Sequence, residues 1–300
     1  METLYIIGGS GFIGKNMVKY YYGNFDIVVV DKYIDKEFFS TYPKVHTIEM
    51  DLVENTISTD SKTPDYIINL ASVVTAERDL SLFDSLISSN LKVLMNLYNR
   101  FKDTISLKLY IQFGSSEEYG SEGSPFNETI REQPNSPYAL VKQLTTNTAM
   151  MLYNNYKFPV MVVRPGNLFG PLQHKSKFIP YVIDCLQSNL PLNVSPCEQK
   201  RDFIYVEDFA FCIQKLMENH SNCIGQIVNV SSGESISLKK IIEFLRLHIN
   251  STSEVNYGAI PYRENEVMDL KCSMDKFIRL TKQPVEFNIF NRLSEIIKQN

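Results

Sequence analysis

A glycine-rich turn lies between a short apolar run and a helical stretch at the N-terminus, and this pattern restricts the fold more than any other feature. Residues 3–7 form the apolar run, residues 8–14 read Gly-Gly-Ser-Gly-Phe-Ile-Gly, and a helical pattern continues to about Tyr22. In such a unit Gly8 permits a tight turn, Gly11 lets the backbone approach a pyrophosphate, and Gly14 allows close packing of the helix. The sequence therefore predicts a phosphate-binding turn, with the phosphate at the helix N-terminus.

The next apolar run, residues 27–30, ends in an acidic residue, Asp31. A carboxylate at this distance after the glycine turn is placed to bond the diol of an adenosine ribose. Because Asp31 would repel a 2′-phosphate, the pattern favours NAD(H). Lys32 and Lys36 nearby keep NADP(H) open as the alternative cofactor.

Short apolar runs alternate with helical stretches through the first half of the chain. The runs lie near residues 3–7, 27–30, 45–50, 66–70, 107–113 and 159–163, and the helical stretches include 81–101 and 137–156. This alternation predicts an α/β protein with a Rossmann-type, doubly wound parallel sheet. We interpret residues 1–165 as an NAD(P)-binding domain, with returning segments near 203–230. Because the alternation loosens after Pro165, residues 166–300 are expected to form mainly a smaller C-terminal substrate-binding lobe.

Two finer expectations concern single elements. Residues 226–230 have the composition of a strand, which we expect to cross between the lobes. In the stretch 81–101, a stripe at helical spacing predicts core or dimer packing. The stripe consists of Ile87, Leu91, Leu94 and Tyr98.

Composition argues against several classes of protein. The chain has 300 residues, 44% hydrophobic and 21% charged, and a formal net charge of −4. This balance, without a basic stripe, argues against nucleic-acid binding. No apolar run approaches the length of a membrane span and no leader pattern is evident, so we expect a cytoplasmic protein that does not bind membranes. The five cysteines lack CxxC spacing, so we expect reduced packing residues and no metal site.

Tyr138 and Lys142 are four residues apart in a predicted helix that begins at Pro137, so they share one helical face. Bringing a phenol from its ordinary pKa near 10 to about 7 requires roughly 4 kcal/mol of preference for phenolate. We expect the adjacent ammonium, helped by a cationic nicotinamide ring, to supply this preference. The pair predicts a tyrosine that exchanges an alcohol proton while hydride moves.

Four polar residues, 115–118 (Ser-Ser-Glu-Glu), follow the apolar run 107–113. They are expected at the carboxyl edge of the sheet, where such folds bind ligands. Paired carboxylates beside a carbonyl are suited to act as acid and base in the elimination of water. Glu118 equally suits a solvated position, and we assign it no role.

Taken in order, these motifs resemble the extended short-chain dehydrogenase/reductase family, in particular its nucleotide-sugar epimerases, dehydratases and 4-ketoreductases. The resemblance covers nearly the whole chain. Besides the glycine turn and the Tyr138 helix, it rests on residues 51–52 (Asp-Leu), 69–72 (Asn-Leu-Ala-Ser), 114–120 (GSSEEYG), 164–171 (RPGNLFGP) and 201–208 (RDFIYVED). Val141 departs from the serine that often precedes the family's lysine.

The resemblance implies roles for named residues. Ser115, Tyr138 and Lys142 would be catalytic: Ser115 bonds the sugar oxygen, Tyr138 is the acid or base, and Lys142 lowers its pKa and orients the ribose. The implied cofactor-binding residues are Gly8, Gly11, Phe12, Ile13, Gly14, Asp31, Lys32, Asp51, Leu52, Leu70, Ala71, Ser72, Tyr138, Lys142 and Arg164. The implied substrate-binding residues are Ser115, Ser116, Glu117, Asn167, Arg201 and Arg263, of which the last three suit a diphosphate. A homodimer built on the two predicted helices is also implied.

The leading interpretation is an enzyme that moves hydride at C4 of a nucleotide-diphosphate hexose, specifically a 4-ketoreductase making a 6-deoxy sugar nucleotide. The tail 258–268 resembles such reductases more than galactose epimerases. A preference for NAD instead suits redox-neutral C4 epimerases and 4,6-dehydratases, and Glu117 falls where those dehydratases keep a glutamate base. These two activities are therefore the alternatives. A non-catalytic dinucleotide-binding sensor or scaffold is the alternative of another class.

Overall fold

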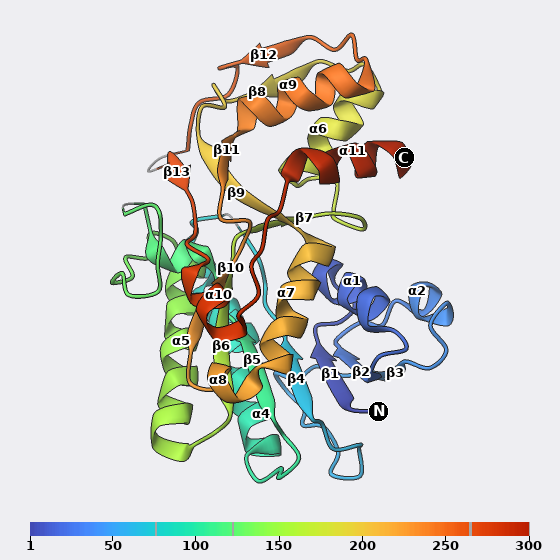
Figure 1. Ribbon diagram of the computed structural model, residues 1–300, viewed down its shortest axis with the longest axis vertical. Coiled ribbons are helices and arrows are strands. Elements are labelled where there is room, and N and C mark those ends of the chain that lie inside the picture. The colour runs from blue at the N-terminus through green and yellow to red at the C-terminus, as the bar shows by residue number, and fades with distance from the viewer. Residues whose placement is uncertain (76, 122, 264–265, 300) are drawn as a thin grey trace.

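The computed structural model describes residues 1–75, 77–121, 123–263 and 266–299, and a seven-stranded sheet forms its centre (Figure 1). The strands are β1 (Thr3–Ile7), β2 (Asp26–Asp31), β3 (His46–Glu49), β4 (Tyr66–Asn69), β5 (Leu109–Phe113), β6 (Val160–Pro165) and β10 (Ile227–Val230). They are arranged in the order β10-β6-β5-β4-β1-β2-β3, and each neighbouring pair is parallel. The strand order reverses between β1 and β4, where such sheets bind ligands at their carboxyl ends. The predicted Rossmann-type sheet is confirmed.

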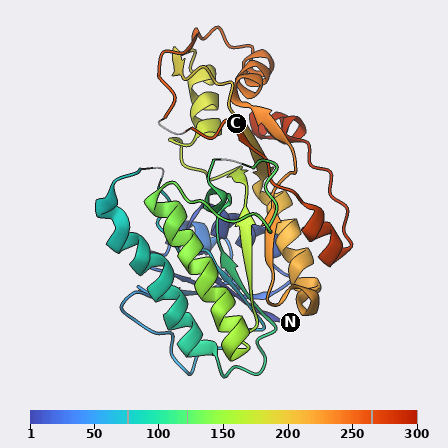
Figure 2. The same cartoon turned by 90° about the vertical axis from the view of Figure 1, so that its left-hand side faces the viewer.

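Helices cover both faces of this sheet. In β1, Leu4 and Ile6 pack into one core and Tyr5 and Ile7 into the other, because successive side chains of a strand point to opposite faces. The first face is covered by α1 (Phe12–Tyr21), α7 (Val206–Glu218) and α10 (Asp275–Thr281). The second is covered by α4 (Val93–Phe101) and α5 (Pro137–Tyr156), which lie side by side in Figure 2. Two-sided burial explains why the strands are nearly continuous apolar runs.

The stretch predicted as one helix over 81–101 is interrupted. It consists of η1 (Leu80–Leu82), α3 (Phe83–Ile87), a π-helix η2 (Ser88–Lys92) and α4. A π turn contains an extra residue and therefore shifts the helix face that follows it. The buried apolar positions are consequently Leu86, Val93, Leu94, Leu97 and Phe101, and Asn90 of the π-helix is buried as well. Ile87, Leu91 and Tyr98 of the predicted stripe are only half-buried.

Residues 226–230 do not cross between lobes, so that prediction is wrong. Residues 227–230 form β10, which pairs with β6 at the edge of the large sheet. Val228 and Val230 are fully buried in the same core as α7 and α10, and this packing fixes the strand to the sheet. The division of the chain at residue 165 stays a prediction.

A smaller set of elements lies above the large sheet in Figure 1. Here β9 (Lys200–Tyr205) pairs with β7 (Asn167–Phe169), β11 (Ser235–Ser237) and β13 (Asp269–Leu270), and β8 (Leu192–Val194) pairs with β12 (Val255–Tyr257). Helices α6 (Phe178–Gln187), α9 (Leu238–Ile249) and α11 (Ile289–Gln299) share a core with these strands. The short helices α2 (Lys36–Ser40), η3 (Ser116–Tyr119) and α8 (His220–Cys223) complete the described elements.

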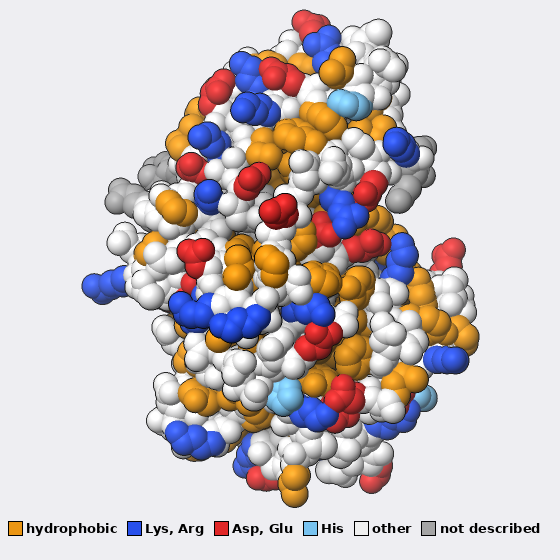
Figure 3. Space-filling model, in the orientation of Figure 1, with side chains coloured by type: hydrophobic (Ala, Val, Ile, Leu, Met, Phe, Trp, Pro, Cys, Tyr) orange, Lys and Arg blue, Asp and Glu red, His pale blue; other side chains and the backbone are white. Residues whose placement is uncertain are grey.

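The surface carries charges of both signs. On the face shown in Figure 3, Lys and Arg side chains are interspersed with Asp and Glu side chains over both lobes. Among the described residues, none of the helices is long and apolar enough to cross a bilayer. On α5, Leu144, Met151 and Tyr156 are exposed. The homodimer expected through this helix stays a prediction, which the particle mass in solution would test.

Gly14 approaches the glycine turn so closely that a Cβ there would lie 2.6 Å from Gly9 O. Because the obstructing atoms belong to the backbone, Gly14→Ala is expected to lower the free energy of unfolding by about 2 kcal/mol or more. Gly11→Ala is the matched control, since its Cβ would meet Gly8 O at an ordinary 3.5 Å; its loss should stay below about 1 kcal/mol. Urea unfolding measures both, and equal stability of the two variants would contradict the close approach.

Candidate active site

The glycine turn forms a cradle against the loop that follows β4. Gly8 has a φ of +76°, and a Cβ there would lie 2.9 Å from Ala71 N, so a side chain has no room. Gly11 is the N-cap of α1, and within the described chain no side chain caps this helix end. The N–H groups of the first helical turn are thus left for an anion. This geometry fits a pyrophosphate lying over the turn.

Asp31 lies beside this cradle at the end of β2. Its Oδ2 accepts a hydrogen bond from Ser10 N–H at 2.9 Å, so the turn itself orients the carboxylate. Lys32 turns to Asp51 instead, with 3.1 Å between Nζ and Oδ2. The Val53 N–H and then Lys32 hold the pKa of Asp51 below its ordinary value. A carboxylate held by backbone N–H groups, beside a lysine that pairs with another carboxylate, is the arrangement expected for a ribose diol rather than a 2′-phosphate.

The other cofactor residues predicted from the sequence surround the same cradle. Phe12 and Ile13 begin α1 and are half-buried, and Leu52 is buried after β3. The loop after β4 is tied to β1, because Leu70 N–H donates to Ile7 O at 2.9 Å. Ala71 and Ser72 continue this loop and are half-buried.

The three predicted catalytic residues meet where β5 ends and α5 begins. Ser136 caps α5 by accepting a hydrogen bond from Ala139 N–H at 3.1 Å, and Pro137 occupies the first turn. Tyr138 and Lys142 are 7% and 2% exposed. The Lys142 ammonium donates to the carbonyl of Phe113, the last residue of β5, at 3.1 Å.

Ser115 follows two residues after Phe113 and caps η3. The Ser115 side chain by itself would lower the pKa of the Tyr138 phenol. The phenol, the ammonium and the hydroxyl therefore share one buried region at the carboxyl edge of the sheet.

The protein's own residues keep Tyr138 protonated. Burial raises the pKa of the phenol well above its ordinary value, and the Glu117 carboxylate raises it further. Burial also lowers the pKa of Lys142 to about 8, against the opposing effect of the Glu118 carboxylate. The ammonium lies 5.7 Å from the centre of the Tyr138 ring. In the protein alone the pKa of Tyr138 is raised, because desolvation of the phenol dominates. The lowering expected from Lys142 together with a nicotinamide ring stays a prediction.

Arg164 does not reach the cofactor cradle with its side chain, which corrects its predicted role. The guanidinium is fully buried, with Nε donating to Glu118 Oε2 at 3.0 Å and Nη2 lying 2.6 Å from Glu132 Oε1. It also lies 4.6 Å over the Tyr119 ring. A fully buried carboxylate requires such a counter-ion, and this need directs Arg164 toward η3.

Glu118 was given no role from the sequence, yet it is fully buried beneath Ser115. Ser115 and Glu118 form a capping box at η3, with Ser115 N–H donating to Glu118 Oε1 at 2.7 Å. The signal for this arrangement was present in the spacing of serine and glutamate three residues apart.

Glu117 is an exposed carboxylate among cations from four segments. Its neighbour Ser116 is buried. Four cations lower the pKa of the Glu117 carboxyl. In decreasing order of effect they are Arg263, Arg201, Arg78 and Lys177. They oppose the larger effect of desolvation, which raises the pKa of Glu117. Two of the predicted diphosphate arginines thus converge here, and Arg78 and Lys177 join them although sequence reasoning had not included them among the site residues.

Arg201 is held in place by its own lobe. Its guanidinium donates to Lys200 O at 2.8 Å and to Val267 O, and pairs with Glu266. Asn167 is half-buried on β7, opposite Phe203 of β9. Residues 264–265 of the predicted tail lie outside the described residues.

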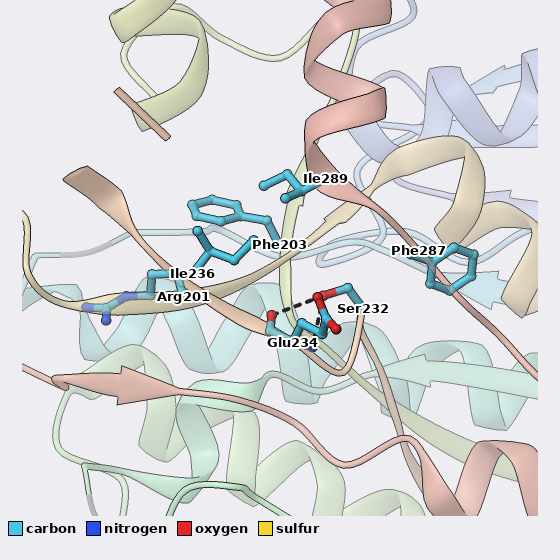
Figure 4. Close-up of a pocket in the computed structure, with 7 residues that line it drawn as sticks. All are labelled: Arg201, Phe203, Ser232, Glu234, Ile236, Phe287 and Ile289. Atoms are coloured by element: carbon cyan, nitrogen blue, oxygen red, sulfur yellow. Dashed lines mark hydrogen bonds between the residues drawn. The ribbon is translucent and has the colours of Figure 1, made fainter. Parts of the chain in front are cut away.

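Two hollows elsewhere do not suit a sugar nucleotide. One, beside Phe203, Ile236 and Ile289, has a volume of about 10 Å³, room for about one water. Figure 4 shows the Arg201 side chain extending away from Phe287 on the far side of this cavity. The other, about 320 Å³, is lined by Phe25 and Tyr66 near the amino ends of the strands, opposite the catalytic residues. Within the described ranges, no group of three or more His, Cys, Asp or Glu side chains is placed to hold a metal.

Residues 4–231 match the profile of the NAD dependent epimerase/dehydratase family. The chain belongs to this enzyme family. CDP-abequose synthase from Salmonella muenchen is 32% identical over 39% of this chain and 40% of that protein. dTDP-D-glucose 4,6-dehydratase from Dictyostelium discoideum is 24% identical over 81% and 62%. The matches thus span less than two thirds of these two relatives.

Other family relatives match over nearly their whole length. CDP-abequose synthase from Salmonella typhimurium is 25% identical over 99% of this chain and 98% of that protein. dTDP-4-dehydro-6-deoxyglucose reductase from Escherichia coli is 25% identical over 90% and 89%. Among solved structures, UDP-N-acetylglucosamine 4-epimerase from Methanobrevibacter ruminantium M1 has a TM-score of 0.90 at 22% identity, covering 99% and 97% of the two chains. The likeness to that structure supports the fold.

Burial of the Lys142 ammonium has a measurable cost. Its pKa falls from 10.5 to about 8. When Lys142 is protonated in both the folded and the unfolded chain, this shift lowers the free energy of unfolding by roughly 3 kcal/mol. Lys142→Met should therefore be more stable than the wild type below pH 8. Between about pH 8 and 10.5 the unfolded wild-type chain binds more protons, so its stability rises with pH and the difference shrinks.

Urea unfolding of both proteins across this pH range checks the prediction. Lys102→Met, at an exposed position, is the control and should show no such difference. A pH-independent gap between Lys142→Met and the wild type would contradict the buried ammonium.

Proposed function

We propose that this enzyme transfers hydride at C4 of a nucleotide-diphosphate hexose with NAD(H), and that it is a 4-ketoreductase producing a 6-deoxy sugar nucleotide. The observation that carries the proposal is the buried cluster of Tyr138, Ser115 and Lys142 at the same sheet edge as the glycine cradle. A nicotinamide cofactor, held by the cradle and Asp31, supplies the hydride when it is bound.

The chain's own residues account for the proton. Tyr138 is protonated in the resting protein, so it is ready to give a proton to the C4 oxygen of a ketone. Ser115 donates a hydrogen bond to the same oxygen and so fixes its position. Lys142, anchored on Phe113 O, holds a positive charge close to the phenolate that results.

The two adjacent glutamates bear on the dehydratase alternative. Elimination of water calls for an acid and a base beside the carbonyl, but Glu118 is fully buried in its pair with Arg164. Of the two, Glu117 is the exposed one, and Ser116 is not an acid. The similarity to a dTDP-4-dehydro-6-deoxyglucose reductase over 90% of this chain also supports reduction.

A redox-neutral C4 epimerase is the second candidate, because one observation favours it. Asp31 is oriented beside the cradle by the Ser10 N–H, while Lys32 is paired with Asp51. The resulting preference for NAD suits an enzyme that regenerates its cofactor in each turnover. The cluster of Ser115, Tyr138 and Lys142 argues against a non-catalytic sensor. For either enzyme, Arg201 and Arg263 would bind the diphosphate, with Asn167 beside them.

The substrate class can be tested with a panel of 4-keto and 4-hydroxy nucleotide sugars. Net oxidation of NADH with a 4-keto-6-deoxy substrate is expected; an isobaric product without net oxidation would indicate an epimerase, and loss of one water a dehydratase. Tyr138→Phe should lower kcat by about 10²- to 10⁴-fold while NADH still binds. Full turnover by this variant would reject the proposed proton donor.

Asp31 should decide the cofactor. Asp31→Ala removes the charged acceptor for the ribose diol, so NADH affinity should fall roughly ten- to a hundredfold. NADPH affinity should fall less or increase, because the repulsion of a 2′-phosphate is removed as well. Fluorescence titration of both cofactors measures this ratio, and an unchanged ratio would contradict the role of Asp31.

A further inference from the structure

Glu118 joins the three elements that carry the catalytic residues. Its Oε1 accepts the Ser115 N–H at 2.7 Å, and its Oε2 accepts from Arg164 Nε of β6 at 3.0 Å. The side chain also lies against α5: a Cβ placed on Gly114 would contact both Glu118 Oε1 and Thr146 Oγ1. Thr146 is one helical turn beyond Lys142 on the same face of α5.

Arg164 is itself fixed from several sides. Besides Glu118 it pairs with Glu132, and its guanidinium lies 4.6 Å over the Tyr119 ring. The Tyr119 hydroxyl donates to Asn229 Oδ1 of β10 at 2.7 Å. The carboxylate below Ser115 is therefore connected to the central sheet, and it has little freedom to move.

Ser115 is held at both of its polar ends by this arrangement. Its N–H is bonded to Glu118, and its hydroxyl oxygen accepts the Glu117 N–H at 3.2 Å. The hydroxyl proton remains available to a ligand, since both bonds leave it unused. Loss of the Glu118 bond would release the first turn of η3 and let the hydroxyl rotate.

We propose that Glu118 is a positioning residue, which with Arg164 as counter-ion fixes the Ser115 hydroxyl beside Tyr138. The inference rests on the proposed hydride transfer, because only that function gives Ser115 and Lys142 their tasks. Glu118 touches neither substrate nor cofactor in this account.

The charge of Glu118 gives the proposal a signature that a purely structural role lacks. The charged and titratable groups that face it are Arg164 of β6, Lys142 and Tyr138 of α5, Tyr119 of η3 and, through Arg164, Glu132. Among the described residues, the charge of Glu118 opposes the lowering of the Lys142 pKa by burial. Removing the carboxylate should therefore move the alkaline limb of the pH–rate profile to lower pH.

The test compares Glu118→Gln with Glu132→Gln in the full chain. Glu118→Gln should lower kcat about ten- to a hundredfold with little change in KM, because the reacting groups are displaced while binding persists. Its alkaline limb should move to lower pH. Glu132→Gln removes the other partner of the same arginine but does not touch Ser115, so kcat should stay within about twofold of wild type.

A double variant separates positioning from folding. Glu118→Leu with Arg164→Met removes both buried charges and is expected to recover the stability that Glu118→Gln loses. The proposal predicts that kcat stays low in this stable protein, with NADH binding intact. Recovery of kcat together with stability, or an unshifted alkaline limb in Glu118→Gln, would overturn it.

Failure of the positioning role is distinguishable from failure of the proposed function. If Tyr138→Phe is inactive while Glu118→Gln is fully active, only the positioning role is wrong. If Tyr138→Phe is itself fully active, Tyr138 is not the proton donor, and the positioning role proposed for Glu118 is wrong as well. If the wild type oxidises NADH with none of the 4-keto nucleotide sugars, the proposed function itself is wrong.

Discussion

The site depends on one constraint: an ammonium, a phenol and a carboxylate are all removed from water within one small region at the end of β5. Lys142, Tyr138 and Glu118 are each less than a tenth exposed. Buried polar groups are tolerated only with partners in good geometry. Here a backbone carbonyl holds the ammonium, and Arg164 with the Ser115 N–H holds the carboxylate. The rigid sheet and α5 keep these partners in place.

Local patterns predicted much of the fold, and long-range contacts determined what they missed. The glycine spacing, Asp31 and Pro137 each act within one or two turns of chain, and the elements they predict are present. The π-helix at Ser88–Lys92 could not be predicted, because no proline or glycine marks it. The place of β10 depends on pairing with a strand some sixty residues earlier. The sequence motif identified Arg164 as a charged residue but did not indicate its partner. That partner, Glu118, lies 46 residues away and determines where the Arg164 side chain points.

The two adjacent glutamates show how the fold separates residues that the sequence presents as a pair. Glu117 is exposed among several cations, whereas Glu118 is buried with Arg164. Glu117 is thus the exposed one of the two, and both carboxylates raise the pKa of the phenol and help keep it protonated. A site whose resting state holds a proton donor and one free carboxylate is suited to reducing a ketone.

The central claim is that hydride reaches C4 of a nucleotide-linked 4-keto sugar. The most direct measurement follows deuterium from NADH labelled at the transferable position into the product. The account predicts one deuterium on C4 of the sugar, located by NMR, for each cofactor oxidised. Product without deuterium, or with deuterium at another carbon, would contradict the account.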